Sequence, residues 1–483
     1  MLRKACLLIY ATISLALAAP CLSASFYVSQ SVPASGDGTS WETAFKTIAE
    51  GIQSAEAGDE VIVAEGTYIE TVDFSGKNIT VRSSDPENAS VVASTVIEVF
   101  GSSEVVRFWS GEAREAILAG FTISAGQTGV SCAESSPVIR RNVIVANTAD
   151  FDNGGGISCY YASPLIEDNT IAANRASQGG AGIACEGGRP VIRGNLLIRN
   201  VSDADGGGIL LVNSTAHVSH NRIIANSAAD DGGGLLCLNS HVELLNNLIA
   251  SNRAGVGGGV FIGDSSTVTL TGNTVVANSS LSGAGGVHLS LSSGTVRNCI
   301  LWANGDDLAG ATATYSCIEN PDDSGEGNIH DDPRFADPDG PDNAVGTQDD
   351  DYTLSEDSPC RDSGFTPAAM PLQIAQTPTH FVLSWDPGRD LAGMARISGA
   401  AVDIGAYEYQ DSSPLYLLES SQDMIRWWSA YLGEYTSASV SDSPADRRSF
   451  FRASVQTPVP GAPARSRTFG PLVPMPSHNQ ITF

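Results

Sequence analysis

The sequence predicts an all-β fold of the solenoid type, a parallel β-helix, and three observations support this prediction. An asparagine recurs with nearly constant spacing: successive positions differ by 27 residues once and by 26 thereafter, a period that is typical of a solenoid. Aliphatic residues stand at constant distances before and after it, and glycines separate the repeats. We therefore expect one repeat to form one coil. The recurring residues are Asn142, Asn169, Asn195, Asn221, Asn247 and Asn273, and Cys299 takes the seventh place.

Each repeat contains three segments that we expect to form strands. Within them aliphatic residues alternate with polar or variable residues at a period of two. The many β-branched residues argue against helices, which leaves three parallel strands per coil. We interpret the asparagines as amide ladders and the glycine clusters as turns that need positive φ. The column three residues before the asparagine contains Ile139, Ile166, Ile192, Val218, Leu244, Leu270 and Val296.

The first 24 residues have the features of a secretory signal peptide. Arg3 and Lys4 precede an apolar run over residues 5–19, and small residues follow it. We therefore expect a secreted or cell-surface protein. No later segment approaches the roughly 20 apolar residues of a spanning helix, so the sequence predicts no transmembrane segment.

The chain is strongly acidic. Its net charge is −28, and removal of the predicted leader, which contains Arg3 and Lys4 but no acid, would make it −30. A charge of this sign disfavours nucleic acid and anionic membranes as partners.

Several motifs resemble those of known β-helix proteins. The glycine turns and the Ile-x-x-Asn pattern are similar to secreted bacterial right-handed parallel β-helix repeat proteins, and to repeats of chlamydial polymorphic outer-membrane proteins. The flanking segments match more specifically, and those near the C-terminus resemble the choice-of-anchor Q type. The resemblance covers about residues 26–410 and implies a right-handed fold and export, but little chemistry. The flanking motifs are residues 38–45, 57–68, 327–335, 358–364 and 402–408.

The sequence divides into six predicted parts. A capping-box pattern of Thr39 with Glu42 and one apolar helical face predict a capping helix over residues 41–55 that covers the open end of the solenoid. The parts are the signal peptide (1–24), the N-terminal cap and first coils (25–100), the parallel β-helix repeats (101–320), the Asp-rich exit region and last coil (321–410), a small β module (411–456) and a disordered Pro-rich tail (457–483).

Seven of the nine cysteines lie after the predicted leader. Four of them occupy an inward strand position that other coils fill with Leu or Ile, which predicts buried thiols. Cys317 and Cys360 lie beyond the repeat. They could form a disulfide that closes the exit region, or remain two free thiols, and the sequence does not decide between these alternatives. The four in the column are Cys132, Cys159, Cys185 and Cys237.

Acidic residues cluster in the turns that precede the glycines, and stacked coils would bring them together. Proteins of the pectinolytic β-helix type place carboxylates near that groove, so a polysaccharide lyase or glycoside hydrolase is an alternative function. The outward positions of the neighbouring strands mostly lack the bases such enzymes need, and a solvated acidic turn is the competing interpretation. The candidate catalytic residues are Asp152, Asp205, Asp230 and Asp231.

A second acidic segment, residues 321–357, contains 13 acids and one base. Such a density repels itself unless it is extended or neutralised by cations. One run in it alternates oxygen donors around a glycine, as loops for hard cations do, which predicts a Ca²⁺ site, with a solvated loop as the alternative. The proposed ligands are Asp337, Asp339, Asp342 and Asn343.

The favoured function is a non-catalytic β-helix that binds an extracellular polysaccharide or another cell-surface component. Repeats provide extended binding surfaces, and an exposed apolar stripe usually marks a contact. The predicted stripe consists of Leu210, Val212, Leu236, Leu238 and Phe261.

Overall fold

The structure is a computed structural model that describes residues 23–101, 103–150, 152–320, 325–366, 389–396 and 401–410. Residues 1–22 of the predicted leader lie outside the described residues. The structure also describes the strands β42 (Gln373–Gln376), β43 (Phe381–Ser384), β44 (Leu415–Ser421), β45 (Trp428–Leu432), β46 (Ser437–Ser439), β47 (Phe450–Gln456), β48 (Ser466–Thr468) and β49 (Gln480–Thr482).

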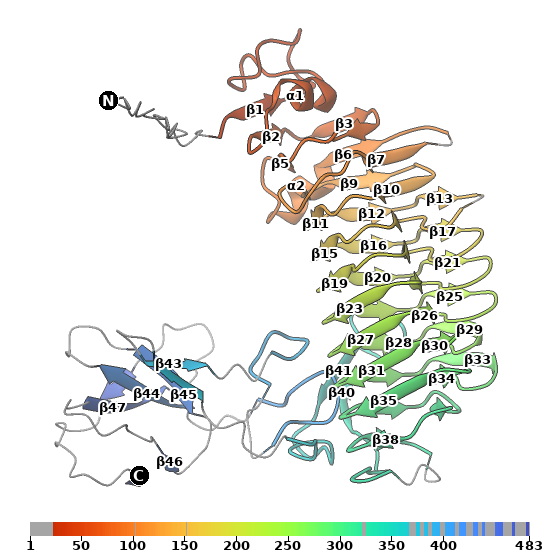
Figure 1. The fold of residues 1–483 in the computed structure, drawn as a ribbon, viewed down its shortest axis with the longest axis vertical. Coiled ribbons are helices and arrows are strands. Elements are labelled where there is room, and N and C mark those ends of the chain that lie inside the picture. Colours follow the sequence, from red (N-terminus) through yellow and green to blue (C-terminus); the bar gives the residue numbers. More distant parts are fainter. Residues whose placement is uncertain are drawn as a thin grey trace, which may run out of the picture.

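Over the described residues, the strands of successive coils stack into four parallel sheets (Figure 1). Three of them run along the whole solenoid, and the fourth is confined to the coils from β13 to β33. This confirms the predicted parallel β-helix. Sheet A contains β1 (Ser25–Val28), β2 (Glu60–Val63), β5 (Thr80–Ser83), β8 (Ile117–Ala119), β11 (Val138–Arg140), β15 (Leu165–Glu167), β19 (Val191–Arg193), β23 (Thr215–Ser219), β27 (His241–Leu245), β31 (Thr267–Thr271), β35 (Ser293–Arg297) and β38 (Ala313–Thr314). Sheet B contains β3 (Gly66–Ile69), β6 (Thr95–Glu98), β9 (Thr122–Ser124), β12 (Val143–Val145), β16 (Thr170–Ala172), β20 (Leu196–Ile198), β24 (Arg222–Ile224), β28 (Leu248–Ala250), β32 (Thr274–Val276), β36 (Ile300–Trp302) and β39 (Cys317–Ile318).

The other two sheets form the remaining side of each coil. Sheet C contains β4 (Val72–Asp73), β7 (Glu104–Phe108), β10 (Thr128–Ala133), β14 (Ile157–Tyr160), β18 (Ile183–Glu186), β22 (Ile209–Val212), β26 (Leu235–Leu238), β30 (Val260–Gly263), β34 (Val287–Leu289) and β37 (Leu308–Ala309). Sheet D contains β13 (Thr148–Ala149), β17 (Arg175–Ala176), β21 (Val201–Ser202), β25 (Ser227–Ala228), β29 (Arg253–Val256) and β33 (Ser279–Ser282). Sheet D was not predicted. The segment between sheets B and C is long enough in these coils to form a ladder of its own, so three strands per coil become four.

The inward columns stack as predicted. Ile139 pairs with Ile166, and Ile166 pairs with Ile192, on adjacent strands of sheet A. All three side chains are fully buried in one core that extends through the coils. Each coil therefore gains apolar contacts and backbone hydrogen bonds from both neighbours, as a repeat protein requires.

The predicted asparagine ladder is also present. The backbone N–H and the side-chain amide of Asn142 both donate to Oδ1 of Asn169, at 3.0 and 3.1 Å, and Nδ2 of Asn169 donates to the carbonyl oxygen of Ile139 at 2.8 Å. The pattern repeats from coil to coil, so each buried amide satisfies backbone groups that the turn leaves unpaired. At the lower end, Cys299 accepts from the N–H of Asn273 at 3.4 Å.

The glycine turns adopt the conformation that the sequence predicts. Gly206 and Gly232 have φ values of 57° and 67°, which favour glycine. The next glycine is needed for close approach: a Cβ on Gly233 would lie 2.5 Å from the carbonyl oxygens of Arg253 and Gly258.

The helix at the N-terminal end is shorter than predicted and begins elsewhere. Helix α1 (Ile48–Ser54) has Thr47 as its N-cap, with a capping box to Glu50, so the predicted box of Thr39 with Glu42 is wrong. Asp37 instead accepts hydrogen bonds from the backbone and hydroxyl of Thr39, which keeps this segment in a loop. The helix lies at the top of the solenoid in Figure 1, and its role as a cap stays a prediction. A second helix, α2 (Ala89–Ser94), was not predicted. No helix in the described part of the chain is long and apolar enough to cross a membrane.

The exit region covers the outer face of sheet B. Tyr352, Leu391 and Tyr407 pack against side chains of that face such as Ile224 and Leu248. A short antiparallel pair belongs to this region, formed by β40 (Phe335–Asp337) and β41 (Asp351–Leu354).

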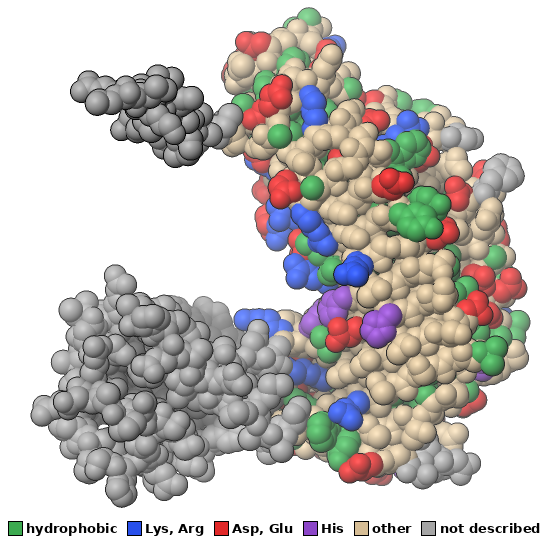
Figure 2. Space-filling view, viewed as in Figure 1, with side chains coloured by type: hydrophobic (Ala, Val, Ile, Leu, Met, Phe, Trp, Pro, Cys, Tyr) green, Lys and Arg blue, Asp and Glu red, His purple; other side chains and the backbone are tan. Residues whose placement is uncertain are grey.

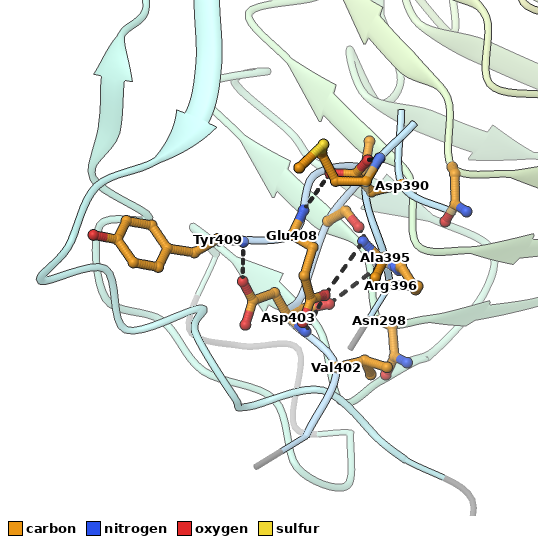
Figure 3. A network of polar contacts seen from close by, with 12 residues as sticks. Asn298, Asp390, Ala395, Arg396, Val402, Asp403, Glu408 and Tyr409 are labelled. Carbon is orange, nitrogen blue, oxygen red and sulfur yellow. Dashed lines mark hydrogen bonds and ion pairs between the residues drawn. The ribbon is translucent and has the colours of Figure 1, made fainter. Parts of the chain in front are cut away.

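A buried polar network holds the last part of the exit region together (Figure 3). The Arg396 guanidinium donates to the carbonyl oxygens of Asp403 and Gly405 and lies 3.9 Å from the Glu408 carboxylate. The Asp403 carboxylate accepts from the N–H of Tyr409 at 2.6 Å. Burial raises the pKa of Asp403 to about 6. The N–H of Gly405 donates to Asn298 of the solenoid at 2.8 Å, which joins the network to the coils.

The predicted C-terminal β module is present as a small antiparallel sheet. In it β44 pairs with β45 and β47, and β47 pairs with β48. The strands β48 and β49 fall within residues 457–483, so the prediction of a disordered tail is wrong for these strands.

The four column cysteines are buried free thiols, as predicted. They lie opposite one another in sheet C where they occupy neighbouring coils, as Cys132, Cys159 and Cys185 do. Cys317 and Cys360 are also buried and free in the structure.

Candidate binding face

The predicted binding stripe on the outer face of sheet C is largely buried. Leu210, Leu236 and Phe261 are 6, 1 and 9% exposed. They form an apolar cluster against which Val212 and Leu238 pack. The expectation of an exposed apolar surface is therefore wrong for the first three residues.

The cover comes from the segments between sheet D and sheet C, which we call the arms. The arms form a ladder outside the sheet, with bridges between Gly179 and Asp205 and between Asp231 and Val256. Val256 packs against the apolar cluster, and a Cβ on Gly179 would lie only 2.8 Å from Cδ2 of Leu210. The arm backbone thus rests directly on the stripe.

The upper coils of the same sheet expose aromatic side chains instead. Trp109, Tyr160 and Tyr161 are 47, 49 and 59% exposed, and we call these three residues the aromatic ridge. Figure 2 shows hydrophobic side chains on the surface of the upper coils, with acidic side chains beside them. The sequence analysis missed the ridge, although Tyr160 directly follows the inward Cys159 and therefore had to point outward.

The register of sheet C places two of these rings in one column. Phe108 pairs with Cys132, and Ala133 pairs with Tyr160, so Trp109 lies two coils from Tyr160 with the small Ala133 between them. Two strand spacings amount to about 10 Å. The column therefore presents two rings with a shallow gap between them.

The Trp109 ring is held on both sides. Its Nε1–H donates to Oγ of Ser131 at 2.9 Å, and the Arg107 guanidinium carbon lies 4.9 Å from the ring centroid, which is within the range of a cation–π contact. Arg107 is in turn paired with Glu104 at 2.7 Å. These contacts orient the indole before any ligand arrives, which lowers the entropic cost of binding.

Tyr161 depends on a glycine in the next coil. Its φ is 46°, and its ring lies edge-on to Tyr160 with 4.6 Å between the centroids. A Cβ on Gly187 would lie 2.7 Å from Cδ1 of Tyr161. The missing side chain of Gly187 therefore provides the space that the Tyr161 ring occupies.

The surroundings of the ridge are acidic. The neighbouring Tyr161 is the main cause of a raised pKa for Tyr160, followed by desolvation and the charge of Glu186, and Glu134 adds to the effect. The nearby Arg107 is already paired with an acid. A neutral ligand fits these surroundings better than an anionic one, because like charges repel.

The structure brings together only some of the candidate catalytic acids. The N–H of Asp231 donates to Oδ1 of Asp205 at 3.1 Å, and burial raises the pKa of both carboxyl groups. The charge of the exposed Asp230 acts in the same direction. Asp152 lies elsewhere: its neighbour Asn153 bridges to Gly179, and Gly179 bridges to Asp205, so Asp152 lies two coils from Asp205. The arms thus carry one carboxylate pair rather than a continuous row of acids.

The predicted calcium loop stays a prediction. Within the described residues no group of three or more His, Cys, Asp or Glu side chains is placed to hold a metal. The Asp342 carboxylate accepts from the N–H of Ala344 at 2.9 Å, and Asp350 accepts from Gly346 and Tyr352. The loop thus uses several of its carboxylates for its own turns. Asp337, Asp339 and Asn343 lie in the same loop, and desolvation, followed by the charge of Asp339, raises the pKa of Asp337.

A cavity of about 500 Å³ lies beside the exit region. It is lined by both the solenoid, including Asp168 and Arg222, and the segment around Leu391. His220 contacts the carbonyl oxygen of Arg389 at 2.8 Å, so this histidine helps to attach the exit region.

Comparisons with known proteins support the fold. The family described as "Right handed beta helix region" matches residues 106–320, and the protein is a right-handed β-helix repeat protein. No curated protein matches the chain in sequence. Three solved structures align with parts of the chain, each with a TM-score below 0.5. They are the crystal structure of pectate lyase Pel9A (13% identity, 80% of this chain and 97% of that chain covered, TM-score 0.49), the complex structure of XylC with xylose (12%, 65% and 87%, 0.37), and the crystal structure of pectin methylesterase in complex with hexasaccharide VII (11%, 51% and 80%, 0.23). At such low identity, the function has to be argued from the residues of this chain.

Proposed function

We propose that the protein binds an extracellular polysaccharide through the aromatic ridge and does not cleave it. The observation that supports this proposal is the exposure of Trp109, Tyr160 and Tyr161 on neighbouring coils of one face. Tryptophan and tyrosine are amphipathic, bury a large area and lose little conformational freedom on binding. They are rarely left exposed in a group without a partner.

The spacing of the ridge suits a sugar chain. The C–H groups on one face of a pyranose ring are apolar and pack flat against an aromatic ring. The backbones at Trp109 and Tyr160 are separated by about 10 Å, two strand spacings, which is close to the length of two linked sugar residues. One polysaccharide lying along the solenoid axis could therefore contact both rings with every second sugar, while Ala133 leaves room for the sugar between them.

The charge of the face narrows the ligand class. Glu134 and Glu186 flank Tyr160, and the whole chain carries a net charge of −28. We infer a neutral polysaccharide rather than pectate or alginate. Secretion, attachment to the cell surface and the bacterial choice-of-anchor Q type belong to the same proposal, because they rest on the sequence motifs alone.

Affinity electrophoresis of the purified full chain tests the proposal. Gels that contain a neutral glycan, such as xyloglucan or glucomannan, should retard the protein, whereas gels with pectate or alginate should not. Trp109→Ala should weaken binding about tenfold or more, which corresponds to roughly 1.4 kcal/mol. Trp41→Ala is the matched control, because Trp41 is 41% exposed but lies in the N-terminal loop. Equal affinity of the two variants, or no retardation in any neutral glycan, would contradict the proposal.

The same samples separate binding from catalysis. Incubation with the acidic and neutral glycans, followed by measurement of reducing ends and of unsaturated products, should show no turnover. Turnover that disappears in Asp231→Ala would instead favour a lyase or hydrolase that uses the carboxylate pair of the arms.

A further inference from the structure

Two cysteines outside the repeat meet at one point of the structure. Cys317 lies in β39, at the end of sheet B, and Cys360 lies in a turn of the exit region 43 residues later. Both side chains are fully buried and belong to one apolar cluster with Ile300, Leu354 and Ile404. Proximity to Cys360 is the largest cause of a raised pKa of the Cys317 thiol, and both thiols are free.

The backbone around Cys360 is well held. Its carbonyl oxygen accepts from the N–H of Ile404 at 3.0 Å, and its own N–H donates to Oγ of Ser358 at 3.2 Å. The Cys317 thiol has a second contact, a 3.3 Å hydrogen bond to the carbonyl oxygen of Asp331. A thiol is a weak donor, so loss of this bond on oxidation costs little.

The cysteine column of sheet C also brings thiols close together, since neighbouring thiols shift the pKa of Cys159 and of Cys185, but its backbone geometry differs. Cys132, Cys159 and Cys185 lie opposite one another on adjacent strands, which the ladder holds about 4.8 Å apart. A disulfide needs Cβ atoms about 3.5–4.5 Å apart and a Cβ–S–S–Cβ angle near 90°, and parallel Cβ vectors at the ladder spacing do not meet these conditions. Cys360 lies in a turn, so no ladder fixes its distance from Cys317.

We propose that Cys317 and Cys360 form a disulfide when the chain folds in an oxidising compartment. The two thiols lose two protons and two electrons and form one S–S bond. A disulfide of a small thiol such as glutathione, or of a thiol–disulfide oxidoreductase, accepts them and is reduced to two thiols. The exchange starts from a thiolate. Contact with the Cys360 thiol, and then burial, raise the pKa of Cys317. The bond therefore forms fastest during folding, before the site closes, and slowly in the folded chain, when local opening exposes the two thiols.

The bond would attach the exit region to the last coils. The turn of Cys360 continues to Asp362, whose N–H donates to Asp403 at 2.7 Å. Asp403 belongs to the buried network around Arg396 (Figure 3), and the same region covers the outer face of sheet B. A disulfide here restricts the unfolded chain and keeps the cover in place. This inference is independent of the ligand of the aromatic ridge.

Peptide mapping tests the proposal. The full chain is reduced, unfolded, refolded in a mixture of reduced and oxidised glutathione, and quenched with acid. It is then unfolded in denaturant, alkylated, and digested with trypsin and a protease that cleaves before aspartate. Cleavage before Asp307 separates Cys299 from Cys317, and cleavage after Arg334 separates both from Cys360. The peptides of Cys317 and Cys360 should be joined, two hydrogens lighter than the sum of the reduced peptides, while the column cysteines are alkylated.

Two further measurements keep the test independent of refolding. Natively purified chain, exposed to the same glutathione mixture for a prolonged period, should give the same joined peptides. A reductant should lower the melting temperature of the oxidised wild type by several degrees, leave Cys317→Ser unchanged, and still act on Cys237→Ser, the matched buried-cysteine control. Complete alkylation of Cys317 and Cys360 in folded protein from both preparations, or a bond from either of them to a column cysteine, would overturn the proposal.

Discussion

The two halves of the outer face of sheet C share one repeat but present opposite surfaces. In the upper half, Trp109 and Tyr160 project into solvent, whereas Leu210 and Leu236 in the lower half are buried. The inward columns of both halves are equally buried, so the difference arises outside the sheet. Only three residues separate β9 from β10 in the upper half, whereas the lower coils insert a strand of sheet D at this place. The arms therefore bury the outward column of Leu210 and Leu236, whereas Tyr160 lies in the next outward column, in register with Val212.

Along each strand of sheet C, the arms cover one outward position but not the next. The arms cover the outward column that contains Leu210 and Leu236, which lies next to the glycine turn. The outward column two residues further on contains Tyr160 and Val212, and its members are exposed or only partly buried. The Tyr160 side chain is therefore exposed, although its coil has an arm.

The largest effect is expected from a charge beneath the arms. Leu236→Asp places a carboxylate at a site that is 1% exposed, and we expect a loss of about 4 kcal/mol in the free energy of unfolding. Tyr160→Asp, on the exposed column of the same face, should cost less than about 1 kcal/mol. Urea unfolding followed by circular dichroism measures both. Equal losses would show that the two positions do not differ in burial.

A smaller effect is expected when the ridge is displaced without losing an aromatic ring. Gly187→Ala introduces a Cβ into the space of the Tyr161 ring, so glycan affinity should fall about threefold to tenfold, and the positive φ of Gly187 should cost about 1 kcal/mol of stability. Gly111→Ala is the matched control, because Gly111 has a similar φ but nothing within 4 Å of the added atom. If both variants lose stability and neither loses glycan affinity, Tyr161 does not belong to the binding site.

The smallest effect is expected on the pH dependence of stability, from the carboxylate pair of Asp205 and Asp231 in the arms. Burial raises the folded-state pKa of Asp205 and Asp231 above 3.8, so the folded protein binds these protons more tightly than the unfolded chain. The resulting stabilisation is complete below pH 3.8 and is lost as the pH rises through the raised values. The free energy of unfolding of the variant with both Asp205→Asn and Asp231→Asn, relative to that of the wild type, should therefore rise between pH 4 and pH 7. The rise should be less than about 1 kcal/mol, because both groups are partly exposed. Urea unfolding midpoints of both proteins at the two pH values measure this rise. A variant whose stability falls relative to the wild type toward pH 7 would contradict the prediction.

The sequence predicted the environments that recur in every coil. Ile166 and Asn195 have the same neighbours as their counterparts one period away, so a single pattern predicts the core column and the amide ladder together. The predictions failed where one part of the chain meets a different part. Leu236 was predicted to be exposed because its alternation is that of a half-buried strand, and a single sequence does not show that an arm folds over it. The capping box was placed at Thr39 rather than Thr47 because both positions carry a glutamate three residues later.

The periodic spacing was sufficient to specify a parallel β-helix, its inward columns, its amide ladders and its glycine turns, because each of these depends on contacts between adjacent copies of one local pattern. The choice between buried and exposed outward positions, the aromatic ridge and the contact of Cys317 with Cys360 were decided by the tertiary structure. These features depend on how far the arms and the exit region fold back over the coils. That distance depends on packing between unlike segments, which no local repeat encodes.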